Sequence, residues 1–580
     1  MPLLTPLTLT DAYKGYTYDL DKLISPEETI ARVKERLARL ELKILKEVLR
    51  IDSGRLDIPV YISLVDVDAM RVMPTRKQMG KGATPAQAEA SALMELVERF
   101  SFFSFLEEGR LLYGRARELG GAALPFSYLA RSLFDTSPAA EVAARFYPDW
   151  PLYFAPATNL ATGEAVLLPF HWFYLIEEFN GPAAGNCPEE AVLQGLCEVV
   201  ERHVGSVISH EQLPTPRIDP ESATDPVVRE LLAKFRRNGI RLWLRDFSLN
   251  TGIPTVGALA YDPATFPEKS EIVFTAGTTT SPEKSLARAL TEIAQLAGDF
   301  HRRTSYRPTL PKYGSLEEAA YLTAEGPRVP LSSLPDISHA NLRVEISQAV
   351  RALGRLGLEP LAVDLTHPAL QIPVYYLLVP GTHFLDRTRN TDTLFHLAKT
   401  AALFAPPAEA LAALSRLEEA APERFDVHFF LGVVLENLGE PEAALQRFRR
   451  SLDLGPPAHE VASLYVHLGS CLKDLEDYPA AVAALEQARE LNPGLKEAHH
   501  LLGYCFFKLG AHREAVLCFE RCIELDPGSG IDYANLGVNL LRLGHTREAA
   551  YVLRQALDLD PSLDFARRLL AEAQGGAGRP

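Results

Sequence analysis

The chain has 580 residues, a length that predicts several domains and excludes a single compact core. Hydrophobic residues make up 47% of it and charged residues 23%, which is typical of a folded globular protein and excludes wholesale disorder. The formal net charge of −16 repels phosphate backbones and anionic lipid surfaces, so neither nucleic acid nor a membrane is expected as a partner.

The cysteines and the amino-terminal residues indicate where the protein works. Six cysteines are too few for a disulfide framework, and they form no paired CxxC spacing of the kind that binds zinc. Residues 1–20 lack a basic segment followed by an apolar stretch, and the apolar runs are shorter than the roughly 18 residues of a membrane span. We therefore expect a cytoplasmic protein in a reducing compartment.

Residues 1–390 combine strand and helix patterns and predict an α+β domain. Apolar runs at 58–65, 272–274 and 373–379 predict strands. A helix is predicted from Ser25 to Leu40, because SPEET supplies a serine cap, a proline and two acids for its first turn. Neither the dinucleotide glycine pattern after a strand nor the phosphate loop GxxxxGK[ST] occurs, so a nucleotide would have to be held in another way.

One pattern occurs three times in this region, at 80–99, 185–202 and 277–295. Each copy has a glycine-containing loop, a proline, and a helix in which an acid is followed three residues later by an acid or an amide. Proline starts each helix, and equal spacing from it places each pair at the same depth on the same face. The first acid always lies 10 residues after the proline, in the pairs Pro85 and Glu95, Pro188 and Glu198, and Pro282 and Glu292, and the second positions are Glu98, Glu201 and Gln295.

The paired acids predict a cation. Two carboxylates three residues apart in a helix repel each other when they lose water, and Mg²⁺ accepts such oxygen ligands together with phosphates. Lys81, Arg99, Arg202 and Arg288 lie beside the acids in the sequence and could neutralise a triphosphate. The alternative is three surface helices with solvated charges, but three copies at equal spacing favour a shared site.

Beyond residue 390 a repeat predicts a second, all-α domain at 391–580. Leu-Gly pairs end at Gly432, Gly469, Gly503 and Gly537, separated by 37, 34 and 34 residues, with an alanine 12 and a proline 24 residues after each glycine. This pattern is typical of tetratricopeptide repeats, which stack pairs of antiparallel helices into a superhelix. The clear repeats are expected at about 425–458, 462–495, 496–529 and 530–563.

Cys518 and Cys522 stand four residues apart in one of these repeats, a spacing that could indicate a metal site. Cys522, however, occupies a small-residue packing position of the second helix. Free cysteine behaves as a small buried hydrophobe, so packing is the favoured interpretation.

Five motifs of the N-terminal region together resemble one known family. They are KGYT and SPEET near the start, GKGATPAQAEASALMELVER, the block from Asn180 to Arg202, and RALTEIAQ from Arg288 to Gln295. Through them the region from Lys14 to Gly381 resembles the YcaO family, which binds ATP with several Mg²⁺ ions. The metal ligands that the resemblance implies are Glu95, Glu98, Glu198, Glu201 and Glu292. The ATP-binding residues that it implies are Lys14, Lys81, Ser91, Asn186, Arg202, Arg288 and Gln295; it names no catalytic nucleophile.

The resemblance also implies a reaction. YcaO proteins activate a peptide backbone amide: a nucleophile adds to the amide carbon, ATP phosphorylates the oxygen, and phosphate leaves to give an azoline or a thioamide. The chain ends in GGAGRP, whereas many ring-forming members end in a proline-rich segment, so ring formation is not favoured.

A YcaO domain followed by helical repeats is similar to the branch linked to methylthiolation of a small-subunit ribosomal protein, and thioamide formation with a TfuA-like partner is a second possibility. The groove of the repeats would recruit the peptide or protein substrate, or such a partner. The alternative is a non-catalytic, ATP-responsive scaffold.

Overall fold

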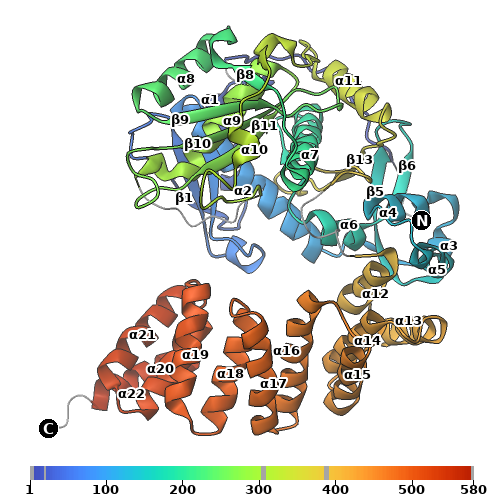
Figure 1. The fold of residues 1–580 in the computed structure, drawn as a ribbon, viewed down its shortest axis with the longest axis vertical. Helices are drawn as coiled ribbons and strands as arrows, with labels where there is room; N and C mark the ends of the chain where they lie inside the picture. The colour runs from blue at the N-terminus through green and yellow to red at the C-terminus, as the bar shows by residue number, and fades with distance from the viewer. Residues whose placement is uncertain (1–4, 19–20, 302–308, 384–390, 577–580) are drawn as a thin grey trace. The chain divides into compact units, whose positions relative to one another are not determined.

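The computed structural model describes residues 5–18, 21–301, 309–383 and 391–576. The chain divides into two compact units, Met1–Leu394 and Phe395–Pro580. The first contains sheets and helices and the second a run of helices, which confirms the expected fold class (Figure 1). Every helix in the described ranges is too short or too polar to cross a bilayer.

The described residues of the first unit form three sheets. One has the antiparallel order β1-β2-β3, with β1 (Leu45–Arg50), β2 (Val60–Val65) and β3 (Lys77–Lys81). The second has the order β11-β10-β9-β8-β12, with β8 (Arg217–Asp219), β9 (Arg241–Asp246), β10 (Thr255–Tyr261), β11 (Val273–Thr278) and β12 (Arg328–Pro330). The third has the order β4-β5-β13-β14-β7, with β6 paired to β5; its strands are β4 (Leu112–Gly114), β5 (Leu152–Asn159), β6 (Ala165–Pro169), β7 (Pro182–Ala184), β13 (Leu361–Asp364) and β14 (Val374–Leu378). The three predicted strands correspond to β2, β11 and β14.

Helices surround these sheets. The helix predicted from Ser25 to Leu40 is α1, and Ser25 caps it: its hydroxyl accepts from the amide of Glu28, whose carboxylate accepts from the amide of Ser25. The helices of this unit are α1 (Pro26–Ala38), α2 (Pro85–Glu107), α3 (Ala116–Leu119), α4 (Phe126–Ser132), α5 (Pro138–Phe146), α6 (Phe170–Glu177), α7 (Pro188–Glu211), α8 (Pro226–Arg237), α9 (Pro282–Ala297), α10 (Ala320–Thr323) and α11 (Leu342–Gly354).

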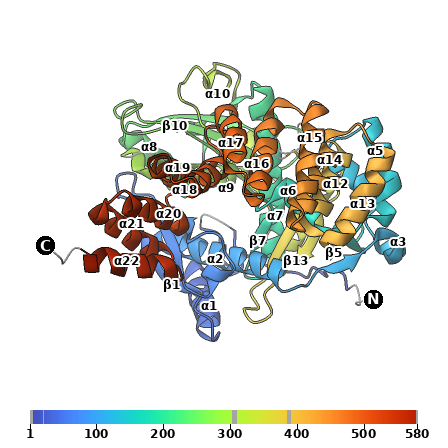
Figure 2. The same cartoon turned by 90° about the horizontal axis from the view of Figure 1, so that it is seen from below.

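Each of the three repeated motifs folds as an edge strand followed by a helix. The helix α2 follows β3, α7 follows β7 and α9 follows β11, and these three strands are the edges of three different sheets. The three helices lie near one another in both views (Figures 1 and 2). Glycine lets two of them pack directly on their own strand: a Cβ at Gly80 would lie 2.1 Å from the amide nitrogen of Ala92, and one at Gly277 would lie 2.3 Å from the carbonyl oxygen of Ser285.

This close packing predicts a strong effect of one methyl group. Gly277→Ala is expected to lower the free energy of unfolding by about 2 kcal/mol, because the new methyl group would meet the backbone of α9 and the strand would have to move. The matched control is Gly354→Ala at the end of α11, where a Cβ meets no described atom within 4 Å. Urea denaturation of both variants checks this, and an equal, small effect would contradict it.

The second unit has paired helices at the predicted repeats. Each Leu-Gly glycine lies under a large side chain of the following helix: a Cβ at Gly432 would lie 2.6 Å from Phe448, and one at Gly503 would lie 2.8 Å from Phe519. Because glycine has no side chain, the two helices of each pair can pack closely at this position. The helices are α12 (Thr393–Phe404), which spans the unit boundary, α13 (Pro407–Ala420), α14 (Phe425–Asn437), α15 (Pro441–Asp453), α16 (Ala458–Asp474), α17 (Tyr478–Leu491), α18 (Lys496–Lys508), α19 (His512–Leu525), α20 (Gly530–Arg542), α21 (Thr546–Leu559) and α22 (Asp564–Gly576).

Candidate functional site

The three motif helices surround one cavity of about 280 Å³. Equal spacing from the helix-starting proline has therefore brought acids that are far apart in the sequence to one place. Of the residues predicted for the site, those that line the cavity are Lys81, Ser91, Glu95, Glu98, Arg99, Asn186, Glu198, Arg202, Arg288, Glu292 and Gln295. Glu201 and Lys14 are not among the described lining residues.

The carboxylates from α2 carry negative charge that the protein only partly compensates. Burial raises the pKa of Glu98 well above its ordinary value, because Arg99 offsets only part of the effect while Glu198 and Glu95 add repulsion. Burial raises the pKa of Glu95 as well, against the opposing charges of Arg99 and Lys81. Carboxylate oxygens whose charge is not fully neutralised suit a hard divalent cation, so the residues present fit Mg²⁺.

On the α9 side of the cavity, positive charge prevails. The Lys81 ammonium, at the end of β3, forms an ion pair with Glu292 of α9. Burial acts to raise the pKa of Glu292, but Lys81, Arg202 and Arg288 outweigh it and hold this pKa below its ordinary value. The cavity thus has a carboxylate-rich wall on α2 and a cationic wall where α7 meets α9.

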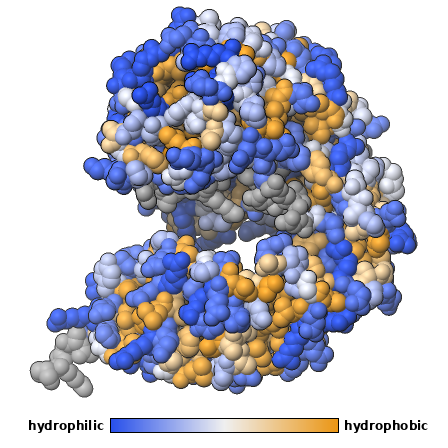
Figure 3. Space-filling model, viewed as in Figure 1, coloured by the Kyte–Doolittle hydropathy of each residue, from blue (hydrophilic) through white to orange (hydrophobic). Residues whose placement is uncertain are grey.

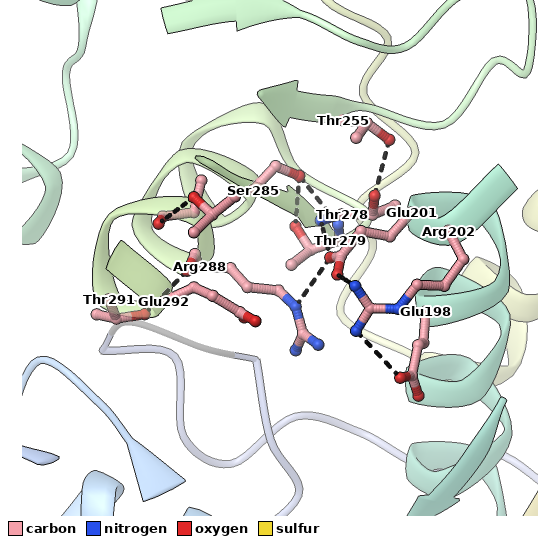
Figure 4. Close-up of polar contacts among 12 residues, drawn as sticks. Glu198, Glu201, Arg202, Thr255, Thr278, Thr279, Ser285, Arg288, Thr291 and Glu292 are labelled. Carbon is pink, nitrogen blue, oxygen red and sulfur yellow. Dashed lines mark hydrogen bonds and ion pairs between the residues drawn. The ribbon is translucent and has the colours of Figure 1, made fainter. Parts of the chain in front are cut away.

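Glu201 is buried behind this cationic wall, with only 1% of its side chain exposed. Its Oε2 accepts from the amide of Thr278 at 2.9 Å and from Nε of Arg288 at 3.2 Å, and its Oε1 lies 3.4 Å from Nη1 of Arg202 (Figure 4). Arg202 also reaches Glu198, with Nη2 3.4 Å from Oε1. Glu201 therefore holds two arginines and the end of β11 in a fixed arrangement, while its predicted role as a metal ligand stays a prediction.

Lys14 and Asn186 have partners in the protein. Nζ of Lys14 lies 2.7 Å from Asp21 and 2.6 Å from Glu345, both beside a smaller neighbouring cavity of about 40 Å³. Glu345 is fully buried, so Lys14 neutralises an otherwise costly carboxylate. Asn186 lines the main cavity, and its amide donates to Glu190 at 3.1 Å.

Sequence reasoning missed several polar lining residues, among them Gln194 and Lys22. Gln194 lies four residues before Glu198 on α7, and its distance of six residues from the helix-starting proline equals that of Ser91 and Arg288, so the signal was present in the spacing. Lys22 also lines the cavity, where its Nζ is 3.8 Å from Glu190. No sequence signal links Lys22 to α7, because the contact is made by an irregular N-terminal segment.

The chain matches models of known protein families in both of its units. A family model described as YcaO cyclodehydratase, ATP- and Mg²⁺-binding, matches residues 79–383, more than half of the chain. The chain belongs to the YcaO family. Two tetratricopeptide repeat models match residues 407–459 and 460–528, which confirms that the second unit contains such repeats, while the predicted bounds of the single repeats stay a prediction. The YcaO description names the two expected cofactors, ATP and Mg²⁺.

Relatives of this YcaO chain come from archaea and bacteria. An uncharacterised protein of Methanothermobacter thermautotrophicus is 28% identical over 390 residues, 62% of this chain and 94% of the relative. A protein from the tfuA 3′ region of Rhizobium leguminosarum bv. trifolii is 26% identical over 391 residues, 62% and 88% of the two chains. The ribosomal protein S12 methylthiotransferase accessory factor YcaO of Escherichia coli is 31% identical over 110 residues, 19% of each chain.

Solved YcaO structures share the fold. YcaO from Methanopyrus kandleri, bound with AMPPCP and Mg²⁺, is 25% identical with a TM-score of 0.50, covering 64% of this chain and 95% of that one. A heterocyclase in complex with substrate and cofactor is 22% identical with a TM-score of 0.53. The match covers 66% of this chain but only 55% of the heterocyclase, and at this identity it speaks for the fold alone.

Proposed function

We propose that the cavity binds Mg-ATP and that the chain uses it to activate a backbone amide of a peptide or protein. The observation that carries this proposal is the convergence of Glu95, Glu98, Glu198 and Glu292 from three helices on one cavity beside Arg202 and Arg288. The glutamates would hold Mg²⁺, with Glu201 behind them. Lys81, Ser91, Asn186, Gln295 and the two arginines would contact the nucleotide. Bound Mg²⁺ would supply charge neutralisation at the phosphates.

The residues of the chain would act by position and charge. In the proposed reaction a nucleophile bonds to the amide carbon and loses its proton, and the amide oxygen takes the γ-phosphoryl group of ATP and releases ADP. The C–O bond then breaks to release phosphate, while a proton leaves the amide nitrogen for an azoline or the added sulfur for a thioamide. Arg202 and Arg288 stay charged at all relevant pH values, because the neighbouring Glu201 and other carboxylates outweigh burial and raise the pKa of both. Held by Glu201, they can stabilise the negative charge of the transferred group without reorganising.

The repeat unit would recruit the substrate or a protein partner. Tetratricopeptide repeats provide an extended surface for peptides. On the face in Figure 3, hydrophobic residues of this unit are scattered among hydrophilic ones, and its exposed apolar side chains include Leu517 (66%) and Tyr551 (60%). The tfuA-region relative favours a TfuA-like partner and thioamide formation, whereas the E. coli relative favours an accessory role in ribosomal protein methylthiolation.

The second candidate is a non-catalytic, ATP-responsive scaffold, which the word "accessory" in the name of the E. coli relative favours. Both candidates require Mg-ATP to bind. Only the enzyme requires phosphate release that depends on a peptide, together with a covalent change in that peptide.

Incubation with ATP, Mg²⁺ and a peptide fraction of the source lysate separates the two candidates. We expect phosphate release to rise when peptides are added, and mass spectrometry to find loss of water for an azoline or exchange of oxygen for sulfur for a thioamide. Glu198→Gln should abolish both signals. Glu211→Gln, at the exposed end of the same helix, should keep both. ATP binding without peptide-dependent release would contradict the enzyme and support the scaffold.

A further inference from the structure

Three potential metal ligands meet in the repeat unit, and none of them belongs to the cavity described above. They are His500 of α18, Cys522 of α19 and Asp532 of α20, and their ligand atoms all lie within 4.8 Å of one another. The three helices are consecutive and lie side by side (Figure 1). Cys522 and Asp532 are fully buried, while 36% of the His500 side chain is exposed and opens the cluster to solvent.

The carboxylate of Asp532 is incompletely satisfied. Its Oδ1 lies 2.7 Å from Nδ1 of His500, but its buried Oδ2 accepts no hydrogen bond of good geometry from the described residues. The Lys496 ammonium is 3.1 Å from Oδ2 and also 2.6 Å from Asp526, so its charge is shared between two acids. Oδ2 therefore depends on one ammonium that it shares with a second acid, and a bound cation would give it a partner of its own.

Cys522 differs from the other cysteine of its helix. Its Sγ contacts the carbonyl oxygen of Lys496 at 3.8 Å, a weak interaction that a metal bond would readily replace. Cys518, one turn earlier, instead packs in an apolar cluster with Leu485 and Leu502. The four-residue spacing of the two cysteines is therefore not the basis of the site, and Cys522 combines burial with polar neighbours.

We propose that His500, Cys522 and Asp532 bind Zn²⁺, with a fourth position open beside His500 for water or a partner's side chain. Sulfur, nitrogen and oxygen donors from three residues are a set that zinc accepts in tetrahedral geometry. On binding, the Cys522 thiol releases one proton to solvent, and His500 binds through Nδ1 while its proton moves to Nε2. The Zn²⁺ charge is balanced by one thiolate and one carboxylate. The Lys496 ammonium then gives up its contact with Asp532 and keeps its ion pair with Asp526.

Cobalt titration of the purified full chain tests this site. Co²⁺ occupies zinc sites, and bonding to a thiolate gives a charge-transfer band in the near ultraviolet that carboxylate ligands do not give. The readout is thus blind to metal in the glutamate-lined cavity and independent of the proposed function. We expect a band that saturates at one Co²⁺ per chain and disappears when Zn²⁺ is added.

Four variants make the test specific. Cys522→Ser should remove the band, whereas Cys518→Ser, in the same helix, should keep it. Asp532→Asn should weaken Co²⁺ binding about tenfold or more. Lys496→Met should strengthen it about tenfold, because an opposing positive charge is removed. Circular dichroism of each variant in EDTA checks the fold. Absence of a band in the parent chain, or a band that survives Cys522→Ser, would overturn the proposal.

Discussion

The Glu98→Gln variant is expected to bind Mg-ATP about a hundredfold more weakly than the parent, and yet to unfold at a higher temperature when Mg²⁺ is absent. Both effects have one cause. The Glu98 carboxylate has lost most of its contact with water, with 15% of the side chain exposed, and Glu198 and Glu95 repel it, so its charge is unfavourable until a cation arrives. Glutamine keeps the shape and removes the charge, which relieves the metal-free fold and deprives the cation of a ligand.

The pH dependence of stability checks this explanation. The pKa of Glu98 is raised in the folded state, so between its ordinary and its raised value the folded chain binds more protons than the unfolded chain. The resulting stabilisation is complete below the ordinary pKa and is lost as pH rises through the raised one. The thermal advantage of Glu98→Gln in EDTA should therefore be larger at neutral pH than near the ordinary glutamate pKa.

Calorimetric titration with ATP and Mg²⁺, together with thermal melts in EDTA, measures the two effects. Glu89→Gln is the matched control on the same helix, because Glu89 pairs with Lys34 at 2.7 Å outside the cavity. It should leave nucleotide affinity unchanged. Unchanged affinity in Glu98→Gln would exclude Glu98 from the binding site, and a lowered melting temperature would contradict the electrostatic explanation.

Loss of the Glu201 side chain should damage both the fold and the site. Glu201→Ala is expected to lower the free energy of unfolding by about 3 kcal/mol or more, because breaking a buried ion-pair network leaves uncompensated charge. Arg202 and Arg288, each with only 15% of the side chain exposed, would lose a shared partner, and the amide of Thr278 would lose its acceptor. Urea denaturation measures the change in stability.

Nucleotide affinity then separates the two possible roles of Glu201. If Glu201 positions the arginines, the affinity of the alanine variant for ATP should stay low at any Mg²⁺ concentration. Recovery of affinity in excess Mg²⁺ would instead indicate a metal ligand and contradict the positioning role. Glu201→Gln, which keeps an acceptor for Thr278, should be less destabilised than Glu201→Ala, since only the charge is lost.

Local spacing predicted much of the site. A proline at the start of each helix fixed the register, and the common distance of 10 residues brought Glu95, Glu198 and Glu292 to one cavity. The same arithmetic predicted the repeats, whose glycines proved to lie under side chains such as Phe448. These predictions were possible because spacing along one helix determines the face on which each residue lies.

Contacts between distant segments could not be predicted in the same way. Glu201 has the register of Glu98 and Gln295 but turns to two arginines, because α7 packs beside the end of β11 and Thr278 offers its amide there. Lys14 pairs with Glu345, which lies 331 residues away. Partners of this kind are chosen by the folded arrangement of sheets and helices, which no spacing within one segment encodes.

The edge strands that precede α2, α7 and α9 belong to three different sheets, and this has a consequence for assembly. The helices that line the cavity follow strands of all three sheets, so a bound ligand would link three separately paired layers to one another. Ligand should then slow the opening of all three together, and hydrogen exchange at β3, β7 and β11 should become protected in concert.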